Sequence, residues 1–275
     1  MKKNDSGPTG RRGGRSMPRG IQSATVGFDI LRVMLESSGP LQLREIAAGA
    51  GMAPSNVHRY LVSFVNVGVA VQDPVTGRYD LGPLAIRLGL AALGRIDGVE
   101  VMVAGLTRLV DAAGIDAHAT IWGSVGPVVL RWRGQPGQIG VRVMEGIVLP
   151  LVTSATGRVW AAHLAPSFTR PLVEREFAAS ARGAGRDRSR RAFEKQLQAV
   201  RETGYAYSSG ERRAGIDALS APVFGSDGRI AFALTLVGPT TNFGARPGRP
   251  AVKQLLASAA ELSQRLGARM TAPPR

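Results

Sequence analysis

The N-terminal part of the chain carries apolar residues at intervals of three and four positions, beginning near Ile21. This spacing places side chains on one face of an α-helix and predicts a helix that ends before Gly39-Pro40. The apolar face consists of Ile21, Ala24, Phe28, Leu31 and Leu35. Residues 1–20 contain no apolar segment of the kind found in signal peptides, and we interpret them as a flexible basic arm.

Two shorter helices are predicted next, over residues 43–50 and 54–66. Gly51, between them, tolerates the positive φ of a tight turn, and Pro54 is accepted in a first helical turn, where an N–H is not needed. The residues predicted to face the core are Leu43, Ile46, Ala47, Val57, Leu61, Phe64 and Val65.

A hairpin is predicted after the third helix. Residues 69–72 and 78–81 have the pattern of β-strands, and residues 73–77 supply Asp, Pro and Gly for the turn between them. Three short helices followed by a two-stranded hairpin predict a winged helix-turn-helix domain over residues 21–83.

The rest of the chain alternates between predicted strands and helices. Residues 84–98 are predicted to form a linker helix, and residues 99–270 a second domain. Strands are predicted over 116–123, 127–133, 139–144, 216–224 and 229–237, and helices over 99–113, 156–165, 169–179, 190–203 and 250–269. Strands clustered at both ends of this domain, with helices between them, indicate an antiparallel sheet flanked by helices, which is an α+β fold.

Basic residues outnumber acidic ones by 35 to 20, which gives a net charge of +15. Such an excess favours a polyanionic partner, because neutralised phosphates release condensed counterions. The chain has no cysteine, which excludes disulfides, thiolate zinc sites and a cysteine nucleophile, and fits a cytoplasmic location. No apolar run is long enough to predict a membrane span.

Polar side chains lie on the predicted third helix, opposite its apolar face. The second helix of a helix-turn-helix enters the major groove, where Asn pairs with adenine and Arg with guanine. The candidate base-reading residues are Ser55, Asn56, His58 and Arg59. Arg44 and Arg78 are candidates for contacts with phosphates, and Arg11, Arg12 and Arg15 of the arm are placed to reach a minor groove.

The sequence leaves two alternatives to DNA reading. An enzyme acting on a small carboxylate is disfavoured because His58, His118 and His163 are scattered and because nucleophile-elbow, phosphate-loop and dinucleotide motifs are missing. A non-specific nucleic-acid-binding protein is favoured by charge alone and leaves the large second domain unexplained. No cofactor or metal is expected.

Several short segments follow one another in an order that resembles the IclR family of transcriptional regulators. The resemblance covers about residues 21–270. The segments are Ile21-Gln22-Ser23, Asn56-Val57-His58-Arg59, residues 77–83 (GRYDLGP), residues 153–158 (TSATGR), Gly204-Tyr205-Ala206, residues 215–224 and Val237-Gly238-Pro239. The resemblance implies a homodimer or a dimer of dimers that binds a double-stranded DNA operator, and repression is favoured over activation. It also implies a GAF-like α/β effector-binding domain for a small organic acid.

The effector site is predicted where small residues lead into the helix at 156–165. Free N–H groups at a helix N-terminus suit a carboxylate, so Ala155 and Thr156 are candidate ligands, although an ordinary capped helix start is the alternative. Ser208 and Thr235 are candidate neutral hydrogen-bonding groups, and Met144, Leu149 and Ile216 candidate apolar lining.

Two positions in the predicted pocket depart from the family pattern. Ala218 stands where family pockets often hold Cys, and Val237 where the last strand commonly offers Ser. These replacements predict a more apolar pocket, and hence an aromatic or otherwise hydrophobic carboxylate rather than a two- or three-carbon keto acid.

Overall fold

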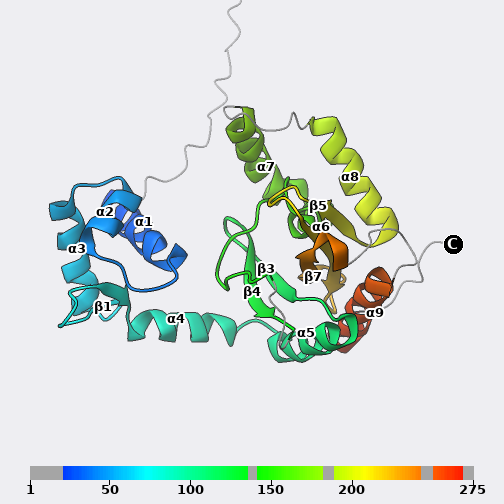
Figure 1. Ribbon diagram of the computed structural model, residues 1–275, viewed down its shortest axis with the longest axis horizontal. Helices are drawn as coiled ribbons and strands as arrows, with labels where there is room; N and C mark the ends of the chain where they lie inside the picture. Colours follow the sequence, from blue (N-terminus) through cyan, green and yellow to red (C-terminus); the bar gives the residue numbers. More distant parts are fainter. Residues whose placement is uncertain (1–20, 136–140, 182–188, 243–249, 269–275) are drawn as a thin grey trace, which may run out of the picture. The chain divides into compact units, whose positions relative to one another are not determined.

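The computed structural model describes residues 21–135, 141–181, 189–242 and 250–268. The chain divides into two compact units, Met1–Ala91 and Ala92–Arg275, each of which is described by itself (Figure 1). Among the described helices, none combines the length and the apolar character that a membrane crossing needs.

The first unit consists of three helices and a hairpin, the arrangement expected of a winged helix-turn-helix. Its elements are α1 (Gln22–Glu36), α2 (Leu43–Ala50), α3 (Pro54–Asn66), β1 (Ala70–Gln72) and β2 (Tyr79–Leu81), followed by α4 (Pro83–Leu93). Backbone bonds between Leu41 and Tyr79, of 2.9 and 2.8 Å, attach the segment before α2 to the hairpin. The core is formed by Ile30, Met34, Ile46, Ala47, Val57, Leu61, Ala70 and Tyr79.

Helix α1 turns a different face to this core from the one that the sequence pattern predicts. Phe28 is 69% exposed and Leu35 is 49% exposed, whereas Ile30 and Met34 are buried. The buried face also includes Gly27, where a Cβ atom would lie 3.1 Å from Cζ of Phe64. A count of apolar residues misses this face because close packing against Phe64 depends on the absence of a side chain at Gly27.

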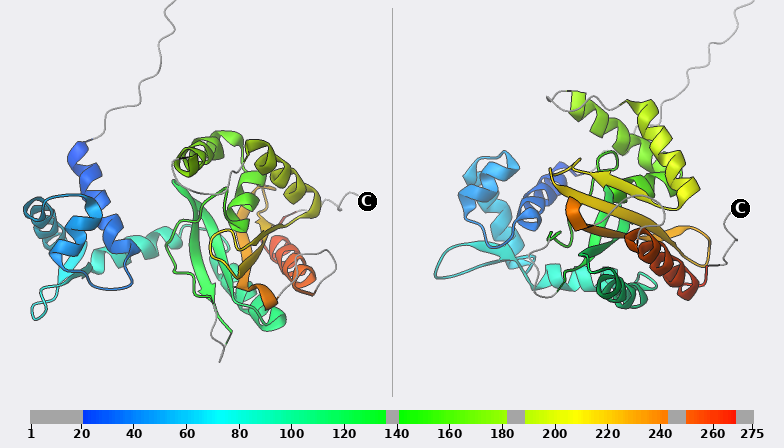
Figure 2. Two further views of the ribbon diagram at one scale, coloured as in Figure 1. Left: turned by 45° about the horizontal axis from the view of Figure 1, so that its top comes forward. Right: turned by 45° about the vertical axis from the view of Figure 1, so that its right-hand side comes forward.

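The second unit is built on one antiparallel sheet with strand order β4-β3-β7-β6-β5 (Figures 1 and 2). The strands are β3 (Ala117–Gly123), β4 (Gly126–Arg133), β5 (Ala206–Ser209), β6 (Ile216–Phe224) and β7 (Ile230–Pro239). The helices are α5 (Val99–Ala113), α6 (Ala155–His163), α7 (Pro166–Ala181), α8 (Arg190–Thr203) and α9 (Pro250–Arg265), with a 3-10 turn, η1, at Thr240–Asn242.

The two faces of the sheet differ in character. Helices α5 and α9 cover a face made of apolar side chains such as Leu219, Leu234 and Leu236. Helix α6 covers the opposite face, with α7 and α8 packed around it (Figure 2). Because side chains alternate across a strand, Ser220 and Thr235 belong to the face toward α6. The buried hydroxyl groups of Ser220 and Thr235 therefore lie together on the side toward α6.

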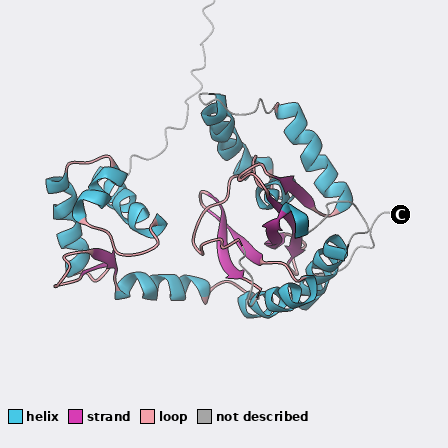
Figure 3. Ribbon diagram, in the orientation of Figure 1, coloured by secondary structure: helices cyan, strands magenta, loops and turns pink. Residues whose placement is uncertain are grey.

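One strand of the sequence prediction is wrong and another was missed. The described part of the predicted strand 139–144 is irregular (Figure 3). Its backbone is held by a side chain instead, because the Asp116 carboxylate accepts hydrogen bonds from the N–H groups of Gln135 and Val141, at 2.9 and 2.8 Å. The edge strand β5, too short to show periodicity, takes the place in the sheet beside β6.

Helix α6 lies so close to the turn before it that Gly157 has no room for a side chain. A Cβ atom there would lie 2.1 Å from the carbonyl oxygen of Pro150 and 2.5 Å from Cα of Leu151. We expect Gly157→Ala to lower the free energy of unfolding of the second unit by about 1–3 kcal/mol, because backbone has to move.

Chemical denaturation followed by circular dichroism measures this change. Gly89→Ala is the matched control, since Gly89 also lies in a helix and a Cβ atom there meets nothing within 4 Å. We expect that control to be neutral or stabilising by up to ~1 kcal/mol. Equal effects of the two substitutions would contradict the close packing of α6 on Pro150.

Candidate functional site

Helix α3 presents polar side chains to solvent in the first unit. It begins with Pro54 in its first turn and buries Val57 and Leu61. The four residues predicted to read bases, Ser55, Asn56, His58 and Arg59, are all exposed. At about 100° per residue, Ser55, Asn56 and Arg59 share one side of the helix, and His58 lies at its margin.

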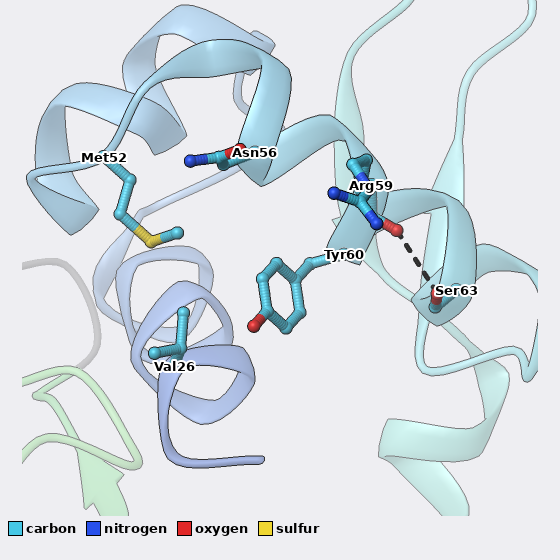
Figure 4. Close-up of a pocket in the computed structure, with 6 residues that line it drawn as sticks. All are labelled: Val26, Met52, Asn56, Arg59, Tyr60 and Ser63. Carbon is cyan, nitrogen blue, oxygen red and sulfur yellow. Dashed lines mark hydrogen bonds between the residues drawn. The ribbon is translucent and has the colours of Figure 1, made fainter. Parts of the chain in front are cut away.

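A hollow of about 490 Å³ lies between α1 and α3, next to this polar side (Figure 4). It is lined by Val26, Met52, Asn56, Arg59, Tyr60 and Ser63. The Tyr60 ring points toward Val26 on α1, and the Ser63 hydroxyl donates to the carbonyl of Arg59 at 3.2 Å (Figure 4). Asn56 and Arg59 therefore line a concave surface that also includes apolar side chains.

The two predicted phosphate contacts differ in their surroundings. Arg44 is exposed on α2. Arg78 donates to the carbonyl of Pro40 at 2.9 Å and pairs with Glu45 at 3.4 Å. Glu45 also accepts from the N–H of Gln42 at 2.6 Å, so Arg78 joins the hairpin to the start of α2. Part of its charge is thus already compensated within the domain.

Charge is unevenly distributed along the chain. Residues 21–91 carry five arginines and five acidic residues, whereas residues 1–20 carry six basic residues and one acidic residue. Arg11, Arg12 and Arg15 of the predicted arm lie outside the described residues. The formal charges of residues 21–91 thus cancel, and the positive excess of the first 91 residues lies within residues 1–20.

The second unit contains a cavity of about 580 Å³ on the face of the sheet toward α6. Six of the predicted effector-binding residues line it, namely Met144, Leu149, Ser208, Ile216, Ala218 and Val237. Ser208 and Ala218 are paired across β5 and β6, and Ala218 is paired with Val237 across β7. One row of the sheet therefore supplies the floor of the cavity.

The other three predicted residues, Ala155, Thr156 and Thr235, lie outside the lining. All three are buried, and the hydroxyl oxygens of Thr156 and Thr235 are 2.8 Å apart. The helix start at α6 is capped by its own Ser154, whose hydroxyl oxygen accepts from the N–H of Gly157 at 2.9 Å. Ser154 itself lines the cavity.

Five charged or titratable lining residues were not predicted. Arg212 and Arg213 come from the loop between β5 and β6, His118 from β3 and Asp217 from β6, and Arg142 lies in the irregular segment before α6. No ion pair joins Arg212 or Arg213 to another residue that the structure describes. Burial lowers the pKa of the Arg212 guanidinium, and Glu176 opposes that shift.

Asp217 brings a negative charge to the same cavity. Its carboxylate accepts from the hydroxyl groups of Ser209 and Thr240, each at 2.8 Å, and from the Tyr207 hydroxyl. These neutral donors hold the Asp217 carboxylate in place at the cavity wall. The cavity combines apolar walls with three arginines, Arg142, Arg212 and Arg213, which suits an amphipathic anion.

The loop that carries the arginines is fixed by a buried ion pair between Arg158 on α6 and Glu211. The side chain of Arg158 is 3% exposed and that of Glu211 is 17% exposed. Arg158 also donates to the carbonyls of Tyr207 and Val152, at 2.8 and 3.3 Å. A single guanidinium thus holds the start of α6, strand β5 and the arginine loop together.

We expect Arg158→Met to lower the free energy of unfolding of the second unit by about 3–5 kcal/mol, because it removes a buried guanidinium that donates to Glu211 and to the carbonyls of Val152 and Tyr207. Arg131→Met is the matched control, since Arg131 and Glu145 form a pair whose side chains are 39% and 43% exposed. That substitution should cost at most ~1 kcal/mol. Similar losses in urea denaturation would show that burial of the Arg158 pair has no energetic consequence.

The unpredicted residues share one cause. Without strand β5 in the sequence prediction, the segment from Glu211 to Arg213 was a loop of unknown position. In the sequence, His118 is one of three scattered histidines, but its place on β3 directs it to the same face as Thr235, its partner in register. Charged residues in a loop between a short edge strand and a central strand are the signal that the sequence offered.

Two family models match the chain. "IclR helix-turn-helix domain" matches residues 23–74, and "Bacterial transcriptional regulator IclR C-terminal" matches residues 90–264.

Known proteins also match nearly the whole length. The transcriptional regulator BhcR of Paracoccus denitrificans is 33% identical over 236 residues, covering 85% of this chain and 84% of its own. The DNA-binding transcriptional repressor YiaJ of Escherichia coli K12 is 24% identical, covering 92% and 90%. The crystal structure of HmgR of Pseudomonas aeruginosa matches with 37% identity and a TM-score of 0.59, covering 91% of this chain and all of that one.

The named relatives are regulators of transcription rather than enzymes. A winged helix-turn-helix with an exposed polar α3 precedes an α/β unit with a ligand-sized cavity. The chain therefore belongs to the IclR family of transcriptional regulators, with an N-terminal DNA-binding domain and a C-terminal effector-binding domain.

Proposed function

We propose that this protein is a cytoplasmic repressor that binds an operator through α3 and senses an aromatic or otherwise hydrophobic carboxylate in its second domain. The observation that carries the effector class is the cavity, which is lined by Arg142, Arg212 and Arg213 and has apolar walls. A relative named as a transcriptional repressor supports the direction of control.

The composition of the cavity supports an anion with a large apolar part. Arg212 and Arg213 supply positive charge at one wall, while Met144, Ile147 and Leu149 supply apolar surface at another. A volume of about 580 Å³ lies in the range of pockets for ligands of ring size and above. A two-carbon keto acid would leave most of the apolar wall in contact with water, which forfeits the hydrophobic contribution to affinity.

The proposed assembly is a homodimer or a dimer of dimers. Within the described chain, no residue of α4 is buried, although the helix is rich in apolar residues. Ile86, Leu88 and Leu90 are about three-fifths exposed, and Phe28 on α1 is 69% exposed. Apolar surface of this extent is typical of association sites, and a second copy of the chain supplies a matching surface.

The effector class is tested by thermal shift and calorimetry with benzoate, phenylacetate, pyruvate and glyoxylate. Aromatic acids should raise the unfolding midpoint in a concentration-dependent manner. We expect Arg212→Ala and Arg213→Ala each to weaken aromatic-acid binding by about 1.5–3 kcal/mol, because each removes a charged hydrogen-bond donor.

Arg229→Ala is the control for charge, because its side chain is 87% exposed and lies outside the cavity lining. It should leave affinity unchanged. Tight binding of pyruvate or glyoxylate, with none of the aromatic acids, would refute the proposed class. An acid that binds should also change the affinity of the protein for its operator, since regulation requires different ligand affinities in the two functional states.

DNA reading is tested with a duplex selected by the wild-type protein from a random pool. We expect Asn56→Ala and Arg59→Ala each to cost about 1–3 kcal/mol on the selected duplex and little on random DNA, because base contacts are lost. Lys253→Ala, which removes an exposed positive charge from α9, should change neither affinity. Fluorescence anisotropy at fixed salt measures the affinity for the selected duplex and for random DNA. An equal loss of affinity for the two would indicate that Asn56 and Arg59 contact phosphates instead of bases.

A further inference from the structure

A row of polar side chains crosses the sheet beside the cavity. His118 on β3 is in register with Thr235 on β7, which is in register with Ser220 on β6. Thr156 of α6 packs onto this row. The four side chains are 0–3% exposed, so none of their polar atoms can rely on bulk water.

Hydrogen bonds link the row in one direction. The Ser220 hydroxyl donates to the carbonyl of Leu234 at 3.1 Å, and its oxygen accepts from the Thr235 hydroxyl at 2.9 Å. A hydroxyl has one proton to donate, so Thr235 must accept from Thr156, at 2.8 Å. Thr156 has then used its own proton as well, and its oxygen is left as an acceptor.

This direction assigns the tautomer of His118. Nε2 lies 3.3 Å from the Thr156 hydroxyl oxygen, which can only accept, so Nε2 carries the proton. Burial, aided by the charge of Arg212, lowers the pKa of His118 to about 3, so the ring is neutral at pH 7. Nδ1 is therefore a bare lone pair.

That lone pair is the unsatisfied end of the row. Nδ1 is shielded from solvent and has no hydrogen-bond partner among the described residues, whereas the other polar groups of the row are paired. An unpaired buried acceptor is costly, and His118 lines the cavity. Because His118 lines the cavity, a molecule bound there is the donor that we assign to Nδ1.

We infer that His118 is a specificity-determining residue that accepts a hydrogen bond from the effector, and that the effector is a hydroxylated aromatic carboxylate. This inference rests on the proposed function, in which Arg212 and Arg213 hold the carboxylate. A carboxylate has no proton to donate at pH 7, so it cannot satisfy Nδ1 of the neutral ring. A hydroxyl group on the aromatic ring of the ligand, away from its carboxylate, supplies that proton.

The first test compares matched probes by calorimetry on the full-length protein. The probes are benzoate, the 2-, 3- and 4-hydroxybenzoates, the three hydroxyphenylacetates and the methyl ether of each hydroxy acid. At least one hydroxy acid should bind about tenfold more tightly than its methyl ether and its unsubstituted parent. A methyl ether fills similar space but has no proton to donate, so the comparison isolates the hydrogen bond.

His118→Phe should abolish this tenfold preference while retaining the affinity for the unsubstituted parent acid. His163→Phe is the matched control, since His163 also has an unpaired buried ring nitrogen but lies outside the cavity lining. That variant should keep the preference.

Nitrogen-15 NMR of histidine-labelled wild-type protein gives a readout that does not depend on a variant folding. The free protein should show a pyrrole-like Nε2 and a pyridine-like Nδ1 for His118, and the bound hydroxy acid should shift the Nδ1 resonance. A proton on Nδ1 in the free protein, or a doubly protonated ring in the complex, would overturn the inference.

The outcomes separate the two proposals. Aromatic acids that bind equally with and without a hydroxyl would overturn the role of His118 and leave the proposed effector class intact. If no aromatic acid binds, both proposals fail together. If His118→Phe still prefers the hydroxy acid, another residue contacts the hydroxyl, and the proposed role of His118 is wrong.

Discussion

The second domain depends on one buried cation. Arg158 is one of the buried residues of α6. Its guanidinium donates hydrogen bonds to the carbonyls of Val152 and Tyr207 and to the carboxylate of Glu211. Burying a charge is costly unless every donor is paired, so these partners fix the position of the guanidinium and it fixes theirs. The start of α6, the edge strand β5 and the loop with Arg212 and Arg213 consequently keep one mutual geometry. Without that constraint, two arginines on a loop between strands would be free to turn into solvent.

The contrast between the two sheet faces explains where a ligand can bind. The face toward α5 and α9 is closed by the packing of apolar side chains. The face toward α6 combines an apolar row, Ala218 and Val237, with a neighbouring polar row, Ser220 and Thr235. Small side chains in the first row leave the space, and the second row offers hydrogen bonds at its margin. The shape of the cavity and its chemistry thus have a common origin in the alternation of β6 and β7.

The sequence predicts the helices and the winged hairpin well because their signals are local: periodicity, turn residues and a helix-starting proline. It also places six of the lining residues, since Ser208, Ala218 and Val237 belong to segments whose order resembles the family. What it misses depends on pairing over long distances. The position of Arg212 requires knowing that β5 is an edge strand, and the state of His118 requires knowing its neighbours in register. The buried face of α1 is missed because the absence of a side chain at Gly27 adds nothing to a hydrophobic pattern.

Helix α6 is common to both ends of the proposed ligand. Its Arg158 holds the loop from which the arginines approach the carboxylate, and its Thr156 fixes the tautomer through which His118 accepts the hydroxyl. A ligand that has only a carboxylate contacts the arginine loop alone. A hydroxy acid also contacts His118, so it interacts with both of the groups that α6 positions. A shift between functional states requires a difference in ligand affinity between them. A state in which α6 moves relative to β3 or to the arginine loop loses one of the two contacts, so a ligand with both groups distinguishes the states more strongly than its parent acid does.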